Sequence, residues 1–552
     1  MAPDRDLYCS HAVVGIFLSV SGQKALQPHR KSFGQHYSPY EIKNWYLYGN
    51  IKTNNYHRTI MSDKVIDQQP KEVFHYFDQI TRIPRPSKKE EKMIAYLQDF
   101  AKEQGLACEV DHAGNVLIRK GATPGYEDRE SIALQCHMDM VCEKDKDVDF
   151  NFETDAIQTY VEDGWVHARG TTLGADDGIG DAVCLAILAS DSIEHGPIEC
   201  LFTRDEETGL TGAMEMAPDF IESKILINLD SEEEGEICIG CSGGKDTVAE
   251  LEYERAYAYP ELHYARIEVR GLHGGHSGSE IDKGYANAVK LLARLLFRLG
   301  NEVEYVLASI EGGNLDNAIP REAHAVIGVA PEDRDALAAF VNVFRTHLQD
   351  EYKVMEPGLR VELDTVETPD YCIDTDTAND LIFALVACPH GVIEMSREID
   401  GLVQTSTNLA SVKMQNEDEE DALMVVTSQR SSIDSQIDMV GDMVRATFEA
   451  IGAGVYEHSP YPGWEPNTDS QILKIACESY RALYDTDPKV YAIHAGLECG
   501  LFRQKRPELD MISVGPTMLY VHSPAERLEV ASVGKFWDYT LDILKRAPKA
   551  GK

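Results

Sequence analysis

Lys224-Ile-Leu-Ile-Asn-Leu-Asp230 is a short apolar run that ends in a carboxylate, and its pattern decides the fold. A run of this length between polar residues is typical of a buried β-strand. A carboxylate at the end of a buried strand is costly unless it is hydrogen-bonded or holds a cation. Similar apolar runs precede polar side chains at Ser131–Asp139 and Ile198–Glu207.

Outward from these runs, strand-like and helix-like segments alternate. Val116-Leu-Ile-Arg119 reads as another strand, while Lys71–Ile80, Glu90–Glu103 and Gly180–Ala189 have helical patterns. Such alternation predicts an α/β domain with a central, mostly parallel sheet.

The pattern changes near residue 245. Runs at Thr247–Tyr253 and His263–Arg270 alternate like half-exposed antiparallel strands, and helical patterns follow at Tyr285–Leu299 and Arg334–Glu351. The α/β pattern returns after Pro462. We therefore expect an inserted α+β domain. The predicted divisions are 1–62, a poorly ordered N-terminal extension; 63–244 and 463–552, two parts of a catalytic domain; and 245–462, the inserted lid domain.

Composition restricts the classes of function. The 552 residues carry a formal charge of −41, which repels nucleic acid and anionic membranes. No window approaches the ~18 consecutive apolar residues of a membrane-spanning helix. Twelve cysteines are spread along the chain, as in a cytosolic protein with reduced thiols. The pair Cys238-Ile-Gly-Cys241 leaves a redox role open, since it has C-x-x-C spacing.

The first 60 residues lack sustained periodicity, and Asp4 and Asp6 offset Arg5, so the basic start of a signal peptide is missing. These residues are interpreted as a poorly ordered extension, or as a gene-model artefact with Met61 as the true start. A cleaved targeting segment is the remaining alternative.

Five short segments offer metal ligands. Three of them have an ordinary explanation alone: a chance His-x-Asp, a helix cap or a surface pair of acids. The His522 segment is uninformative alone, whereas Asp230 at the end of a buried strand is more telling. Most, however, lie at or just after an apolar strand, and in an open α/β sheet such positions converge. Two imidazoles with several carboxylates suit a site for two divalent metals, with zinc favoured, and paired metals typically drive hydrolysis. The segments are Gln135–Asp139, Leu173–Gly178, Arg204–Gly209, Leu226–Ser231 and Val521–Pro524.

Longer stretches carry a resemblance. From about Val65 to Ala547 the chain closely resembles the aminoacyl-histidine dipeptidases, or cytosol non-specific dipeptidases, two-zinc peptidases related to glutamate carboxypeptidase and carnosinase. The matching stretches are Ala168–Asp176, Ile225–Gly235, Gly274–Gly278, Asn317–Ala323 and Ile493–Phe502.

The resemblance implies a role for each metal-site residue. Asp176 would bridge two metals, with His137 and Asp230 completing one site. Glu207 and His522 would complete the other. It also implies a cis peptide bond after Asp176. Two further residues would act without binding metal: Asp139 would orient His137, and Glu206 would be the general base.

The inserted domain would act as a lid that contributes to the substrate site. His276 would stabilise the oxyanion, in relatives often across a dimer interface. Arg430 and Asn317 would hold the substrate's terminal carboxylate. His494 and Glu498 would lie near the substrate end of the cleft.

The resemblance thus implies a cytoplasmic, homodimeric metallodipeptidase that hydrolyses unblocked dipeptides, Xaa-His included, with zinc replaceable by manganese or cobalt. The charge of −41 indicates no nucleic-acid or membrane partner. Alternatives are an N-acyl amino acid hydrolase or carboxypeptidase with the same ligands, and a catalytically inactive binding protein. The inactive protein is expected to have lost a ligand or Glu206, and none is lost here.

Overall fold

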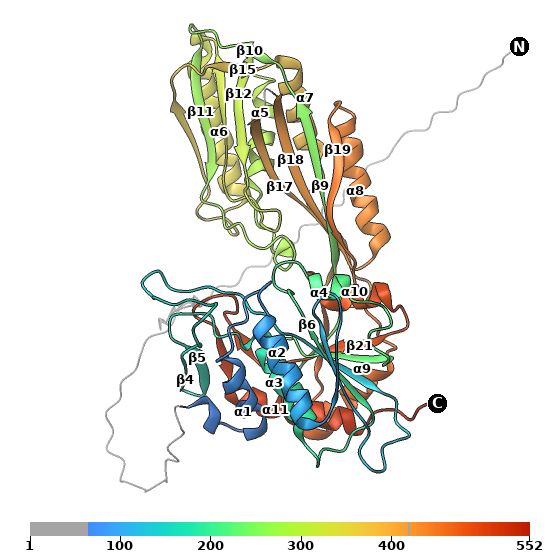
Figure 1. Ribbon diagram of the computed structural model, residues 1–552. Coiled ribbons are helices and arrows are strands. Elements are labelled where there is room, and N and C mark those ends of the chain that lie inside the picture. The colour runs from blue at the N-terminus through green and yellow to red at the C-terminus, as the bar shows by residue number, and fades with distance from the viewer. Residues whose placement is uncertain (1–63, 418–419, 552) are drawn as a thin grey trace, which may run out of the picture. The chain divides into compact units, whose positions relative to one another are not determined.

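The computed structural model describes residues 64–417 and 420–551, and Figure 1 shows their arrangement. The expectations for the N-terminal extension, 1–62, lie outside the described residues. The described residues belong to one compact unit that contains two large sheets.

The first sheet has eight strands in the order β1-β2-β6-β3-β7-β21-β8-β20. β3, β6, β7 and β21 are mutually parallel, and β8 is parallel to β20. Antiparallel pairing occurs between β1 and β2, β2 and β6, and β8 and β21. The prediction of a mostly parallel central sheet is therefore confirmed. The strands are β1 (Ala107–Val110), β2 (Val116–Lys120), β3 (Ile132–His137), β6 (Ile198–Thr203), β7 (Ile225–Asn228), β8 (Glu236–Cys241), β20 (Lys489–Ile493) and β21 (Asp510–Ser513).

Both faces of this sheet are covered by helices, because successive strand residues point to opposite faces. Ile132 and Leu134 pack into one core, whereas Ala133 between them packs into another. The first core contains α1 (Lys71–Ile80), α2 (Glu91–Gln104), α3 (Ala175–Ala189), α9 (Gln471–Tyr484) and α11 (Val530–Lys545). The second contains α4 (Thr211–Glu215) and α10 (Glu498–Lys505).

The second sheet has nine strands, with the order β14-β11-β13-β12-β17-β18-β9-β19 and β16 paired to β17. All its described pairings are antiparallel. The strands are β9 (Gly243–Glu252), β11 (His263–Arg270), β12 (Tyr305–Gly312), β13 (Ala323–Val329), β14 (Arg360–Thr365), β16 (Gly391–Met395), β17 (Val403–Glu417), β18 (Glu420–Ser431) and β19 (Gly454–Tyr461).

This sheet contains the same unit twice. β11-α5-β12-β13-α6-β14 is a βαββαβ unit, and β9-α7-β17-β18-α8-β19 repeats that order with β16 added. The two units meet where β12 pairs antiparallel with β17, at Gly312 and Val412. The helices are α5 (Ala288–Leu299), α6 (Arg334–Glu351), α7 (Thr375–Ala387) and α8 (Asp434–Glu449).

All four helices cover one face of the second sheet and share its core. Leu423 and Val425 of β18 point into that core, so Arg430, an odd number of residues away, points to the opposite face. This alternation places Arg430 on the face without helices.

The chain also forms two small sheets. One comprises β22 (Met518–Leu519), β23 (Arg527–Glu529), β5 (Trp165–Ala168) and β4 (Thr159–Glu162); the other pairs β10 (Arg255–Tyr257) with β15 (Tyr371–Ile373). None of the described helices is long and apolar enough to span a membrane. The divisions at 244/245 and 462/463 stay predictions.

Candidate metal centre and active site

Three neighbouring parallel strands bring candidate metal ligands to one edge of the first sheet. His137 is the last residue of β3, which lies between β6 and β7. Glu206 and Glu207 lie in the turn after β6, and Asp230 lies just after β7. Because these strands are parallel, their carboxyl ends meet at the same edge, as the sequence predicted.

The fourth ligand segment lies at the start of α3. Asp176 and Asp177 have non-helical backbone angles, and the peptide bond between them is cis, as the resemblance implied. The helix-capping bond falls to Asp177, whose Oδ1 accepts from the N–H of Gly180 at 3.0 Å. Asp177, and not Asp176, therefore caps the helix, so capping does not explain the Asp176 carboxylate.

Asp176 faces two imidazoles with its two carboxylate oxygens. Oδ1 lies 3.0 Å from Nε2 of His137, and Oδ2 lies 3.1 Å from Nε2 of His522. Asp230 Oδ1 is 3.5 Å from the His137 nitrogen, and Glu207 Oε2 is 3.0 Å from the His522 nitrogen. The described residues thus form two candidate ligand sets that share Asp176.

The electrostatics of these sets suit cations. Burial and the charges of neighbouring carboxylates raise the pKa of Glu206 and Asp230 well above their usual values, although His137 acts to lower both. Hydrogen bonds with Asp176 and then Glu207 raise the pKa of His522 to about 11. These shifts reflect an excess of negative charge in a buried site. Nitrogen and oxygen donors of this kind fit zinc, manganese or cobalt.

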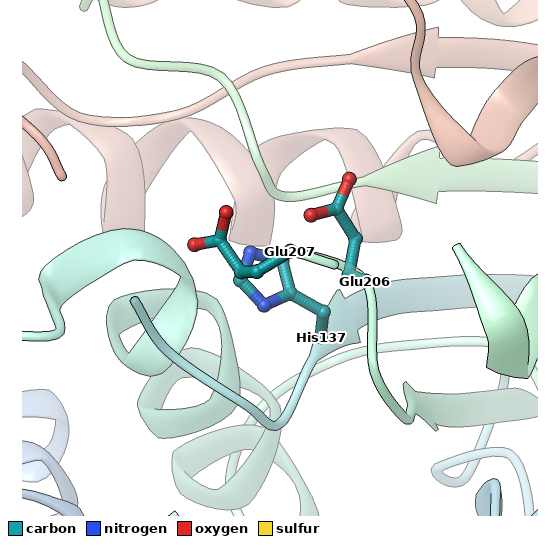
Figure 2. A group of neighbouring side chains, drawn as sticks. All are labelled: His137, Glu206 and Glu207. Carbon is teal, nitrogen blue, oxygen red and sulfur yellow. The ribbon is translucent and has the colours of Figure 1, made fainter. Parts of the chain in front are cut away.

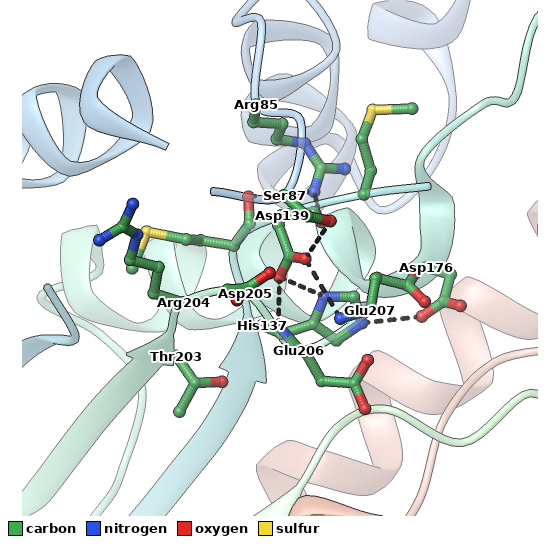
Figure 3. Close-up of polar contacts among 12 residues, drawn as sticks. Arg85, Ser87, His137, Asp139, Asp176, Thr203, Arg204, Asp205, Glu206 and Glu207 are labelled. Carbon is green, nitrogen blue, oxygen red and sulfur yellow. Dashed lines mark hydrogen bonds and ion pairs between the residues drawn. The ribbon is translucent and has the colours of Figure 1, made fainter. Parts of the chain in front are cut away.

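Asp139 organises one side of the centre, as Figure 3 shows. Its Oδ1 lies 3.4 Å from Nδ1 of His137 and accepts from the N–H of Glu206 at 3.0 Å. Its Oδ2 accepts from Ser87 Oγ at 2.7 Å and from the N–H of Glu207 at 3.2 Å. Burial acts to raise the pKa of Asp139, but the nearby His137 imidazole and the hydrogen bond from Ser87 prevail and lower it to about 2. A single buried anion therefore contacts both His137, a candidate metal ligand, and the Glu206–Glu207 turn.

Glu206 and Glu207 diverge in direction. Figure 2 shows their carboxylates on different sides of the His137 ring. Glu207 contacts His522, whereas the Glu206 carboxylate has no hydrogen bond or ion pair to any residue in 64–417 and 420–551. One carboxylate oxygen of each glutamate and one ring nitrogen of His137 lie within 4.8 Å of one another. Glu206 is thus placed beside the centre with its carboxylate uncommitted.

His276 lies in the loop between β11 and α5. Its Nδ1 accepts from the backbone N–H groups of Gly278, at 3.0 Å, and Ser279, at 3.1 Å. Since a backbone N–H can only donate, Nδ1 carries no proton, and the ring proton is on Nε2. Burial and the charge of Arg430 lower the pKa of His276, which favours the neutral ring. His276 is therefore a preset hydrogen-bond donor.

Arg430 is a buried cation, with 8% of its surface exposed. Its Nη1 donates to the Tyr461 hydroxyl at 2.7 Å, and its buried Nε has no hydrogen-bond partner among the described residues. No carboxylate in the described ranges forms an ion pair with it, although Asp246 lies near enough to feel its charge. A buried guanidinium without an anionic partner is costly unless a ligand supplies the charge.

The remaining predicted substrate residues occupy different places. His494 Nε2 lies 2.7 Å from Ser406 Oγ of β17, so the loop after β20 contacts the second sheet. Glu498 is 2% exposed at the start of α10, and its Oε2 accepts from Gln135 and Thr203 beneath the metal centre. The Asn317 side chain is exposed, while its carbonyl accepts from the N–H of Ser277 at 2.8 Å.

Sequence reasoning missed two residues that support the site. Arg85, 1% exposed, donates to the carbonyls of Met138, Asp139 and Gly174. Glu526, 2% exposed, accepts from backbone N–H groups of the Asp176 loop. Both act on backbone groups far away in the chain, which no local motif reveals.

The cysteine pair has no feature of a redox site. Cys238 and Cys241 are free and buried, and burial raises their pKa values to about 11 and about 12. Thiols in such surroundings are poorly reactive, which favours the interpretation as structural residues.

The chain is similar in sequence to known metal-dependent peptidases. The pattern of peptidase family M20/M25/M40 matches residues 133–546. The chain belongs to this family. It is 41% identical over 479 residues to the cytosol non-specific dipeptidase of Escherichia coli (strain K12), covering 87% of this chain and 98% of that relative.

Solved structures of family members also match. The aminoacylhistidine dipeptidase of Vibrio alginolyticus has a TM-score of 0.82 and 40% identity, covering 88% of this chain and 99% of that one. A tripeptidase of Staphylococcus aureus, at 16% identity and a TM-score of 0.53 over 87% of this chain and 99% of that one, shares the fold. The expected zinc-peptidase-like catalytic fold with an inserted domain is thereby confirmed.

Proposed function

We propose that the protein is a metallodipeptidase that hydrolyses unblocked dipeptides, Xaa-His dipeptides included. The observation that carries the proposal is the division of the Asp176 carboxylate between His137 and His522, with Glu206 uncommitted beside them. The names of the two relatives at about 40% identity support dipeptides over the N-acyl amino acids and longer peptides of the alternatives.

Two sets of residues would hold the metals. His137, Asp176 and Asp230 would hold one ion, and Asp176, Glu207 and His522 the other. We propose zinc, which manganese or cobalt can replace, because imidazole and carboxylate ligands accept all three. Two such ions, when bound, lower the pKa of water and polarise a carbonyl group.

Glu206 is the proposed general base. It would take a proton from the attacking water and pass it to the amine that leaves. Its carboxylate can do so because no residue of the described chain occupies it, whereas its backbone N–H is fixed by Asp139 at 3.0 Å. Asp139 itself would keep His137 oriented through Nδ1.

Two residues of the second sheet's domain would bind the substrate. His276 would donate from Nε2 to the oxyanion that develops on the carbonyl oxygen. Arg430 would bind the terminal carboxylate, whose charge would compensate the buried guanidinium. The charge of Arg430 acts on His276 within one chain, so both groups can serve the same substrate. Asn317, His494 and Glu498 stay candidate substrate residues.

We also propose a cytoplasmic homodimer, following the resemblance and the name of the Escherichia coli relative. The charge of −41 argues against nucleic acid and anionic membranes as partners. Light scattering of the purified protein at several concentrations tests the oligomeric state.

A substrate panel tests the proposed activity. Purified protein loaded with zinc is assayed on free dipeptides, on the same dipeptides N-acetylated, on N-acetyl amino acids and on longer peptides. We expect free dipeptides to have the highest kcat/KM. Faster hydrolysis of N-acetyl amino acids would favour the acylase alternative, and no hydrolysis of any compound would favour a binding protein.

A further inference from the structure

We propose that Glu526 is a positioning residue that sets the half of the metal centre formed by Asp176, Glu207 and His522. This inference rests on the proposed two-metal site. The Glu526 side chain lies between the two loops that carry Asp176 and His522, and it binds no metal in our assignment. Its role is to fix where those two ligands stand.

The contact with the Asp176 loop consists of four backbone groups. Glu526 Oε2 accepts from the N–H groups of Leu173 at 2.7 Å and Gly174 at 3.1 Å. Oε1 accepts from those of Ala175 at 2.8 Å and Asp176 at 3.5 Å. These groups lie at the start of α3, where backbone N–H groups have no acceptor within the helix. A carboxylate, which can accept at both oxygens, satisfies all four.

The Asp176 loop is also fixed from its carbonyl side. The buried guanidinium of Arg85 donates to the carbonyl of Gly174. The N–H of the same glycine donates to Glu526. Gly174 has φ +67°, and a Cβ there would lie 2.7 Å from Arg85 Nη2. The loop is therefore held between a buried cation and a buried anion, which leaves it little freedom to shift.

The same residue secures the His522 turn. The N–H of Glu526 donates to the Ser523 carbonyl at 3.0 Å, which closes the turn after His522. His522 has φ +61°, and half of its side chain is exposed, so its own packing does little to hold it. Glu526 therefore links the His522 turn to the Asp176 loop, which is 350 residues away in the sequence.

The other half of the centre shares Asp176 but depends less on this contact, because its other two ligands are fixed by the sheet. His137 ends β3 and Asp230 follows β7, and these two strands pair directly in the sheet. Loss of the Glu526 carboxylate should therefore affect the two metal sites unequally. A general weakening of the fold would affect both sites alike.

The test is a zinc titration of Glu526→Gln, with Glu529→Gln as the matched control. Glutamine has nearly the same shape, but its NH2 group cannot accept from the Asp176 loop. The Glu529 side chain lies three residues further on and has no hydrogen bond or ion pair among residues 64–417 and 420–551. Zinc content after dialysis and the stepwise zinc Kd values are measured for wild type and both variants.

We expect two zinc ions per chain in wild type and in the control. In Glu526→Gln we expect one ion held at wild-type affinity and the second weakened roughly 10- to 100-fold, the usual effect of losing a residue that orients a ligand. Excess zinc should restore kcat in this variant. Two ions at wild-type affinity, or equal weakening of both, would overturn the proposal.

Two further outcomes are distinguishable. If Glu526→Gln does not fold, Glu526→Asp takes its place: the shorter carboxylate should again weaken one ion more than the other, and equal weakening counts against the inference. If wild type itself binds fewer than two ions, the proposed function fails, and with it the site that Glu526 would position.

Discussion

The carboxylate of Asp139 accepts a hydrogen bond from the backbone N–H of Glu206, with Oδ1 and N 3.0 Å apart. The same oxygen lies 3.4 Å from Nδ1 of His137. One buried anion therefore sets both a metal-site imidazole and the proposed general base. Disturbing Asp139 should affect metal binding and proton transfer together.

For Asp139→Asn we predict a roughly 10- to 100-fold loss of zinc affinity, because a carboxamide cannot accept at both ends from Ser87, Glu206 and Glu207. We also expect kcat to stay reduced at saturating zinc, because Glu206 would be misplaced. Zinc titration and assays at increasing zinc check both effects. Full recovery of kcat by zinc would limit Asp139 to orienting His137.

Metal removal should abolish activity and lower thermal stability. The centre gathers several buried carboxylates, and bound cations would offset their repulsion. A ligand at about 100 times its Kd stabilises the folded state by about 2.7 kcal/mol. We expect chelator to lower Tm and turnover, and zinc, manganese or cobalt to restore both. Activity in fully metal-stripped protein would exclude the two-metal account.

Arg430→Lys should raise KM for free dipeptides strongly, because an ammonium cannot reproduce the two-pronged contact of guanidinium with a carboxylate. Dipeptide amides should be poor substrates of wild type and should lose little more in the variant. Arg397→Lys, at a side chain that is 87% exposed, is the control. Equal wild-type rates on amides and acids would remove this role from Arg430.

His276→Ala should lower kcat about 10²- to 10³-fold, as expected when one oxyanion donor is lost. Metal content should stay unchanged, because His276 is not among the proposed ligands. His273→Ala, in the same loop and stacked on Tyr285, serves as the control and should retain activity. Similar losses in both variants would point to a disturbed loop.

The sequence predicted the elements with the clearest periodicity best. β11 and α6 have the bounds expected for His263–Arg270 and Arg334–Glu351, because the spacing of their apolar residues keeps one period throughout. The repetition of the βαββαβ unit was not predicted. It becomes visible only in the order and pairing of the elements, in which β9 pairs with β18, 170 to 188 residues further along the chain.

Some residues of the candidate site could be predicted from the sequence and others could not. His137, Glu207 and Asp230 could be identified as candidates because each ends or follows an apolar strand, and parallel strands bring their ends together. Arg85 and Glu526 could not, since their partners are backbone groups that any sequence offers. The placement of Glu498 beneath the centre was also not foreseen, because it depends on Gln135 and Thr203 of two other strands.

The most direct test of the account is turnover by Glu206→Gln, with metal content measured on the same sample. The glutamine keeps the shape of the side chain but cannot accept the proton. We predict two metal ions per chain, an unchanged fold, and a kcat for free dipeptides that is reduced roughly 10²- to 10⁴-fold. Near-wild-type turnover with both metals bound would contradict the assignment of Glu206 and the mechanism built on it.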